Sequence, residues 1–157
     1  MTDREIGVLP AEAMASLSGL ELLREMAAGR LPAPPMGGLM GFRLVEVSPG
    51  AAVFEGVPGP HLLNPLGGVH GGFALTLIDS AAGCALHSEL PAGTGYTTVE
   101  TKVNMTRPIR PDGRTIRCEG RVVTRGRQIG TTEARLLDAD GKVLAHGTST
   151  LIILAPR

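Results

Sequence analysis

The sequence predicts an α+β domain in which a curved antiparallel β-sheet wraps one long central helix, with a further helix at the N-terminus. Two observations carry this prediction. Residues 72–89 have a helical pattern that is apolar nearly all round, which is typical of a buried helix. The flanking segments predict two strands before this helix and four after it, so a sheet is available to cover it.

Composition excludes several classes of partner. The chain has 157 residues, enough for one domain with its own core, and a formal net charge of zero. Zero net charge gives no general attraction toward nucleic acid or an anionic membrane surface. The absence of Trp and the presence of a single Tyr also argue against base stacking. We therefore expect no nucleic-acid partner.

Three features indicate a cytoplasmic protein without a membrane partner. Cys84 and Cys118 are too few for a disulfide framework and lack metal-ligand spacing, so we expect two buried free thiols and no metal. The N-terminus lacks the basic and apolar regions of a secretory signal. No apolar run reaches the ~18 residues that are typical of a membrane span.

Residues 1–38 are expected to form an N-terminal helix and a proline-rich connector, and residues 39–157 the main domain. Ser18-Gly19-Leu20-Glu21 has the spacing of a capping box, and the helix that follows it should end at Gly29. The prolines within residues 31–35 favour an extended connector, because proline cannot continue a helix.

Strand patterns surround the long helix. We expect strands, in chain order, over residues 39–48, 51–57, 96–107, 115–125, 129–138 and 143–154. Arg125-Gly126-Arg127 and Asp138-Ala139-Asp140-Gly141 are predicted turns between neighbouring strands. An antiparallel sheet built from these strands could wrap the apolar helix.

A loop of small residues leads into the long helix, with the sequence Asn64-Pro65-Leu66-Gly67-Gly68-Val69-His70-Gly71-Gly72. Gly71 and Gly72 lie where the helix should begin, and unpaired N–H groups at a helix N-terminus can hold an oxyanion. A tight strand-to-helix turn is the alternative. Asn64 could donate to the same oxygen or cap a turn. His70 could orient a ligand or be a hydrogen-bonded structural residue.

Asp79 is the carboxylate of the long helix. It shares a stripe with apolar residues such as Leu75, Ala82 and Leu86. Burying a carboxylate among such residues is costly unless it is paired or faces a pocket. The position suits a general base or nucleophile. The alternative is an aspartate that is satisfied by a neighbouring threonine, serine or backbone amide.

The distance between these two features predicts a homodimer. Asp79 lies eight residues beyond Gly71, which is about 12 Å along one helix. A base must come within roughly 3 Å of the water that attacks the carbonyl. One helix cannot easily supply both the oxyanion donor and the base for one substrate, whereas two antiparallel helices from two subunits can. A two-fold axis would then give two equal sites.

The combined motifs match a known family. Asn64…Gly68-Val69-His70-Gly71-Gly72-Phe73…Leu77-Ile78-Asp79 closely resembles the hotdog-fold acyl-CoA thioesterases of the phenylacetate-degradation (PaaI) type. The resemblance covers about residues 39–154 and includes Gly41-Phe42-Arg43-Leu44-Val45-Glu46-Val47 and the turn at residues 125–127. It implies the hotdog fold, a long helix wrapped by an antiparallel sheet, and a homodimer that often pairs into a homotetramer.

The resemblance also implies hydrolysis of acyl-CoA thioesters to free acid and coenzyme A, without a cofactor. Asp79 would be the general base or nucleophile, and the Gly71 N–H would polarise the thioester carbonyl. Asn64 would help to hold that carbonyl or the attacking water, which Thr98 would help to position, while His70 would have a supporting role. Gly72 is an expected substrate-binding residue, and Arg125 and Arg127, together with Arg107 and Arg110, would lie near the coenzyme A phosphates. A solvated turn is the alternative for the arginines.

Two other functions compete with this one. A non-catalytic acyl-CoA-binding protein could have the same fold, although it would not need an intact set of Asn64, Gly71 and Asp79. A hotdog hydratase or dehydratase would act on the acyl chain through a catalytic histidine, for which His70 is the candidate. The preferred acyl group is not evident from the residues. Its pocket is expected around the central helix and the connector.

Overall fold

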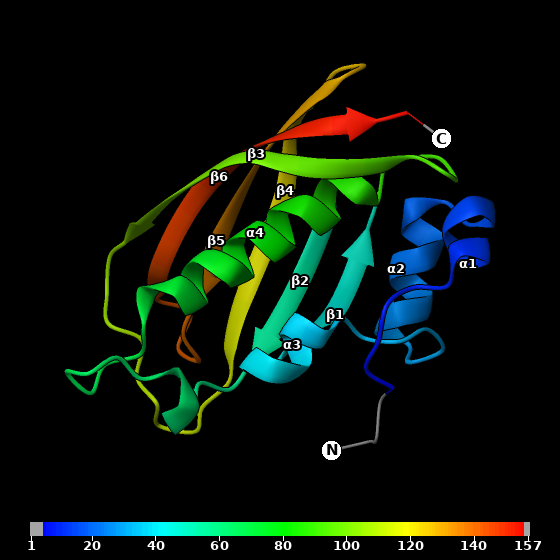
Figure 1. Ribbon diagram of the computed structural model, residues 1–157. Coiled ribbons are helices and arrows are strands. Elements are labelled where there is room, and N and C mark those ends of the chain that lie inside the picture. Colours follow the sequence, from blue (N-terminus) through cyan, green and yellow to red (C-terminus); the bar gives the residue numbers. More distant parts are fainter. Residues whose placement is uncertain (1–4, 156–157) are drawn as a thin grey trace.

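The computed structural model describes residues 5–155 and confirms the predicted fold class. A six-stranded antiparallel sheet curves around the long helix α4 (Gly71–His87), as Figure 1 shows. Three shorter helices, α1 (Ala11–Ser16), α2 (Gly19–Ala27) and α3 (Pro35–Met40), precede the first strand, and Figure 1 shows α1 and α2 beside the edge of the sheet. The architecture is therefore α+β, with one central helix inside one sheet.

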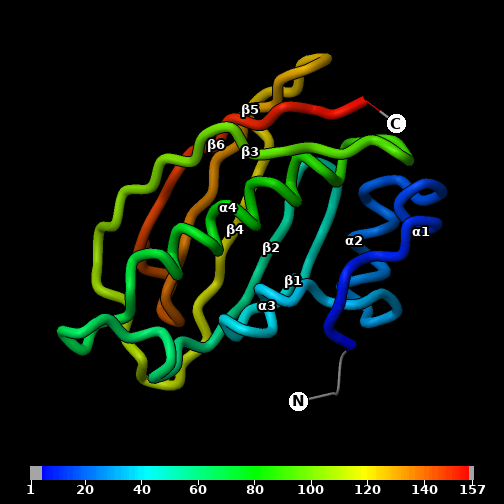
Figure 2. The backbone as a smooth tube through the Cα atoms, viewed as in Figure 1, coloured from blue at the N-terminus to red at the C-terminus, as the bar shows by residue number. Residues whose placement is uncertain are grey.

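The order of the strands leaves two edges. The strands are β1 (Phe42–Ser48), β2 (Ala51–Gly56), β3 (Gly95–Met105), β4 (Ile116–Arg125), β5 (Ile129–Leu137) and β6 (Val143–Leu154). They lie in the order β1-β2-β4-β5-β6-β3, so β1 and β3 are the edge strands. A short 3₁₀-helix, η1 (Pro60–Leu62), precedes the loop into α4. Figure 2 shows this loop at one end of the sheet and α4 crossing the concave face.

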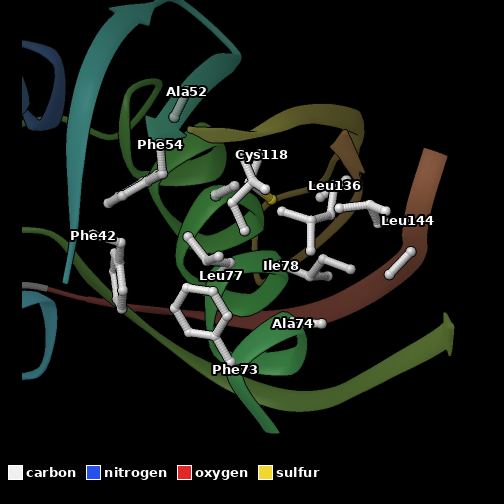
Figure 3. Packing of buried hydrophobic residues seen from close by; sticks show 14 of the residues in the cluster. Phe42, Ala52, Phe54, Phe73, Ala74, Leu77, Ile78, Cys118, Leu136 and Leu144 are labelled. Carbon is white, nitrogen blue, oxygen red and sulfur yellow. The ribbon is translucent and has the colours of Figure 1, made fainter. Parts of the chain in front are cut away.

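Helix α4 is buried because its sequence offers apolar surface on nearly every side. Leu77 and Ile78 are completely buried. Small residues such as Ala81 and Ala85 are also completely buried and let the strands approach the helix closely. Figure 3 shows the side chains that close the core around α4, which include Phe42 of β1, Phe54 of β2, Cys118 of β4, Leu136 of β5 and Leu144 of β6. This packing fixes the orientation of α4 relative to the sheet.

Gly120 of β4 lies at the closest approach between sheet and helix. A Cβ at this position would fall 2.3 Å from the carbonyl oxygen of Ala81. Because that oxygen belongs to the backbone of a buried helix, it cannot turn away. We expect Gly120→Ala to lower the free energy of unfolding by at least about 2 kcal/mol, measured by urea denaturation.

Gly95→Ala is the matched control for this substitution. A Cβ at Gly95, also in a strand, would meet no described atom within 4 Å. Its effect on the free energy of unfolding is therefore expected to stay within about 0.5 kcal/mol. Equal stability of the two variants would contradict the close contact between β4 and α4.

The predicted N-terminal helix and its cap are confirmed. The Glu21 amide donates to Ser18 Oγ at 3.3 Å, and the Ser18 amide donates to Glu21 Oε2 at 2.8 Å. These two reciprocal bonds are the capping box that starts α2. Helix α2 then buries Leu22 and Leu23. The short helix α1, before this cap, was not expected from the sequence.

The proline-rich connector differs from its prediction. Its last proline, Pro35, begins helix α3 instead of continuing an extended segment. Proline fits the first position of a helix, where its missing N–H is not needed. Gly41, with φ +74°, then ends α3 in the left-handed conformation, so β1 starts at Phe42 and not at residue 39. Helix α3 thus spans the predicted boundary between residues 38 and 39.

The two predicted turns between late strands are present. Residues 126–128 join β4 to β5, and the Gly126 amide donates to the Ile129 carbonyl at 2.8 Å. Asp138 Oδ1 accepts hydrogen bonds from the amides of Asp140 and Lys142 in the turn between β5 and β6.

Among the described residues, no helix is both long and apolar enough to cross a membrane.

Candidate functional site

The start of α4 presents a free backbone donor. Helix α4 begins at Gly71, and His70 is its N-cap. His70 Nδ1 accepts the Gly72 N–H at 2.9 Å, whereas the Gly71 N–H has no partner within residues 5–155. The free N–H therefore lies at the positive end of a seventeen-residue helix, where an oxyanion is stabilised. His70 holds the turn that exposes it.

Asn64 organises the loop before the helix. Its Oδ1 accepts hydrogen bonds from the amides of Leu66 at 2.9 Å and Gly68 at 3.2 Å. A bridge between Leu63 and Val69 brings the ends of this loop together. Turn capping is thus one function of Asn64. Its Nδ2 group makes no hydrogen bond in the described part of the chain, which leaves a donor available to a ligand.

Asp79 is fixed by two threonine hydroxyls of the edge strand β3. Thr98 Oγ1 donates to Asp79 Oδ1 at 2.9 Å, and Thr101 Oγ1 donates to the same oxygen at 3.0 Å. The second carboxylate oxygen, Oδ2, has no hydrogen-bond partner among the residues that the structure describes. One oxygen is therefore satisfied by threonines, as the alternative reading of the sequence expected, and the other is open to a ligand.

A β-bulge explains why Thr98 and Thr101 point the same way. Residues three apart in a regular strand face opposite sides of the sheet. Here Thr98 pairs with Leu151 and Glu100 with Thr150, so Val99 is an extra residue that resets the alternation. Thr101 was not predicted from the sequence, because a regular strand would turn it away from Thr98. The only available signal was the concentration of threonines in this segment.

Ser149 extends the hydrogen bonds of Asp79 into the core. Thr101 Oγ1 and Ser149 Oγ lie 2.5 Å apart, and Ser149 is only 1% exposed. Thr101 has one hydroxyl hydrogen, which it donates to Asp79, so Ser149 must donate to Thr101. The resulting chain of hydrogen bonds runs from β6 through β3 to the carboxylate and fixes its orientation.

Replacing Thr101 by valine tests this chain of hydrogen bonds. Valine keeps the branched shape but leaves the buried Ser149 hydroxyl without its acceptor. We expect Thr101→Val to lower the free energy of unfolding by about 1–3 kcal/mol, measured by urea denaturation. The double variant Thr101→Val/Ser149→Ala should recover most of this loss, because both partners are then apolar. A double variant that loses more stability than Thr101→Val would refute the proposed pairing.

An apolar pocket opens beside Asp79, between the edge strands β1 and β3. Its volume is about 240 Å³. Its polar lining residues are Arg43, Asp79, Ser80, Cys84, Tyr96 and Thr98. The remaining walls are mostly apolar and come from the N-terminal segment and the first two strands, with Met26, Met36, Phe42, Leu44 and Phe54. The pocket can therefore hold an apolar group next to the open oxygen of Asp79.

Cys84 and Tyr96 are neutral polar groups of this pocket. Burial raises the pKa of the Cys84 thiol to about 12, while a hydrogen bond from the Tyr96 hydroxyl opposes part of that effect. Burial also raises the pKa of Tyr96 well above its ordinary value. Because only a thiolate is a strong nucleophile, this raised pKa disfavours Cys84 as the reactive group. Asp79 remains the candidate reactive group.

The predicted arginines lie at opposite ends of α4. Arg107 lines a pocket of about 280 Å³ together with Gly71, and its Nη1 donates to the Val143 carbonyl at 2.8 Å. Arg125 Nη1 donates to the Glu89 carbonyl at 2.7 Å, just beyond the C-terminal end of α4. These ends are separated by about 25 Å, the length of the helix. Arg127 is exposed on the turn after β4.

Within residues 5–155, no three or more His, Cys, Asp or Glu side chains come together in a group that could hold a metal ion. A long buried helix wrapped by a curved antiparallel sheet, with a helix start and a carboxylate as its polar features, defines a hotdog-fold protein. Residues 66–145 match the family model of the thioesterase superfamily, which is half of the chain. The chain belongs to that superfamily.

Solved structures agree with this assignment. The structure of a phenylacetic acid degradation-related protein from Ralstonia eutropha JMP134 is similar, with a TM-score of 0.74 and 26% identity over 83% of this chain and 98% of that chain. The predicted resemblance to hotdog thioesterases of the phenylacetate-degradation type is thus confirmed. A Streptococcus mutans protein bound to acetyl-CoA shares the fold, with a TM-score of 0.68 and 24% identity over 74% of this chain and 91% of that chain.

A curated relative matches a shorter segment. A candidate esterase from Halobacterium salinarum is 39% identical over 69 residues, which is 43% of this chain. The matched segment spans 44% of that relative, less than half of its length.

Proposed function

We propose that the protein hydrolyses acyl-CoA thioesters to the free acid and coenzyme A. The observation that carries this proposal is Asp79, whose Oδ1 is held by Thr98 and Thr101 while Oδ2 is open to an apolar pocket. Membership of the thioesterase superfamily supplies the reaction class. The acyl group would occupy the apolar pocket, with its thioester carbonyl beside the carboxylate.

Two routes are compatible with the arrangement around Asp79. In the first, Asp79 takes a proton from water as the water oxygen bonds to the carbonyl carbon. In the second, Oδ2 itself attacks and forms an acyl-enzyme that water then hydrolyses. In both routes the C–S bond breaks and the leaving sulfur receives a proton. The oxyanion that forms in between would accept the Gly71 N–H, with Asn64 as a second donor.

We propose that each complete site needs two subunits. Gly71 and Asp79 of one chain are about 12 Å apart along α4, too far to act on one carbonyl. The edge strand β3 supports pairing with a second copy, because no strand of the described residues pairs with its outer side along its eleven residues. Val99 on β3 is 57% exposed and Leu75 on α4 is 41% exposed, so apolar surface is available next to that edge. We also propose that two such dimers pair into a homotetramer.

Coenzyme A would bind at the start of α4 in the pocket that Arg107 and Gly71 line, which shares no lining residue with the groove along η1. The acetyl-CoA in the Streptococcus mutans structure supports a coenzyme A ligand for this fold. Arg107 is the best-placed of the predicted arginines, because it lines the same pocket as Gly71. Arg125 and Arg127 lie at the far end of α4 and could reach the same ligand only from the partner subunit. Gly72 and His70 would act by shaping the helix start.

A thiol-release assay tests the proposed function. The purified protein is mixed with phenylacetyl-, hydroxybenzoyl- and straight-chain acyl-CoAs, and free coenzyme A is followed with a thiol reagent. Release of thiol from at least one substrate is expected. A non-catalytic acyl-CoA-binding protein, or a hydratase acting on the acyl chain, would release none.

A further inference from the structure

Two neighbouring hollows share one wall residue, Met36. The first is the apolar pocket beside Asp79. The second is an open groove of about 460 Å³ that runs along η1 and the start of α4. Met36 of α3 lines both hollows. The groove is lined largely by apolar side chains, among them Met40, Leu62, Leu63 and Phe73.

The backbone around Met36 is fixed, whereas its side chain is free to move. Helix α3 is held on one side by the buried Gly37, where a Cβ would fall 2.9 Å from the carbonyl oxygen of Phe42. Met36 itself is 52% exposed, and its unbranched thioether side chain adopts several conformations at low cost. A residue of this kind, which lines both hollows, is suited to separate them in one conformation and to join them in another.

We propose that Met36 limits the length of the acyl group by closing the pocket beside Asp79 off from the groove. This inference rests on the proposed thioesterase function. The pocket extends from Asp79 to Cys84, five residues or about 7.5 Å along α4, enough for roughly six carbons or one aromatic ring. A longer straight chain must pass Met36, and the apolar groove beyond it is where its tail would lie.

The test compares Met36→Ala with Leu39→Ala. Leu39 is the matched control, because it lies on the same helix, is 74% exposed and lines neither hollow. The values of kcat/KM are measured for hexanoyl-CoA and decanoyl-CoA. In Met36→Ala the ratio of decanoyl to hexanoyl is expected to rise at least about tenfold, because additional methylenes become buried in the groove. Leu39→Ala should keep the wild-type ratio.

The possible outcomes separate this inference from the proposed function. If Met36→Ala still hydrolyses hexanoyl-CoA with the wild-type ratio, the role of Met36 is wrong and the thioesterase function stands. An equal rise in Leu39→Ala would also overturn it, because the effect would then belong to the helix as a whole. If the wild-type protein releases no thiol from any acyl-CoA, both proposals fail. Thermal unfolding of both variants verifies that they are folded.

Discussion

Asp79→Asn is expected to lower kcat for acyl-CoA hydrolysis by about 1,000-fold, within the range for loss of a general base. Asparagine has nearly the same shape and can still accept hydrogen bonds from Thr98 and Thr101, so the fold should persist. It cannot take a proton from water or form an acyl-enzyme. The measurement is thiol release at saturating substrate, with circular dichroism to verify folding.

Asp140→Asn is the control for this charge change. Asp140 is exposed, pairs with Arg114, and lies in the turn between β5 and β6, away from the pocket beside Asp79. Its kcat should equal that of the wild type. Near-normal hydrolysis by folded Asp79→Asn would remove Asp79 from the mechanism. Intact-protein mass spectrometry during turnover then distinguishes the two routes, because only a nucleophilic Asp79 adds the mass of the acyl group to the chain.

Gly71→Pro is expected to lower kcat by about 100- to 1,000-fold, the usual cost of losing one oxyanion donor. Proline removes the free N–H without disturbing the helix, because Gly71 is the first residue of α4 and proline is favoured there. His70, with ψ 135°, already has the extended conformation that precedes proline. Thiol release at saturating substrate measures the loss of kcat.

Gly71→Ala separates the donor from the space around it. It keeps the N–H, and its Cβ would fall 2.6 Å from the Cε atom of Met105, the flexible end of a side chain that can move aside. It should therefore retain far more activity than Gly71→Pro. If the two variants lost activity equally, crowding and not the N–H would explain the effect.

Mixing the two inactive variants tests whether each site is shared between subunits. In a dimer of one Asp79→Asn chain and one Gly71→Pro chain, one site has both defects and the other has none. Random pairing makes half of the dimers mixed, so co-expressed chains should recover about a quarter of the wild-type activity. A site built within one chain would recover nothing.

The parts of the fold that depend on local pattern could be predicted from the sequence. The apolar residues of α4 identified a buried helix, and Ser18 and Glu21 identified the start of α2. The family resemblance identified Thr98 as a site residue, although the hydrogen bond between its hydroxyl and Asp79 is known only from the structure. Each of these is a property of neighbouring residues, or of a motif with fixed spacing.

The features that the sequence did not predict depend on contacts between distant segments. Thr101 reaches Asp79 because of a bulge at Val99, and a bulge depends on the pairing of β3 with β6. Helix α3 forms where prolines favoured an extended chain, because it packs on β1. The arginines looked like one group in the sequence, but the length of α4 separates them.

Helix α4 and the N-terminal wall of the pocket beside Asp79 differ in how readily they can accept mutations. Almost any change on the buried faces of α4 would disturb the sheet around it, as the contact at Gly120 illustrates. The wall that contains Met26 and Met36 belongs to short N-terminal elements that carry neither Asp79 nor Gly71. Mutations there could alter which acids are released while the reaction centre is inherited unchanged.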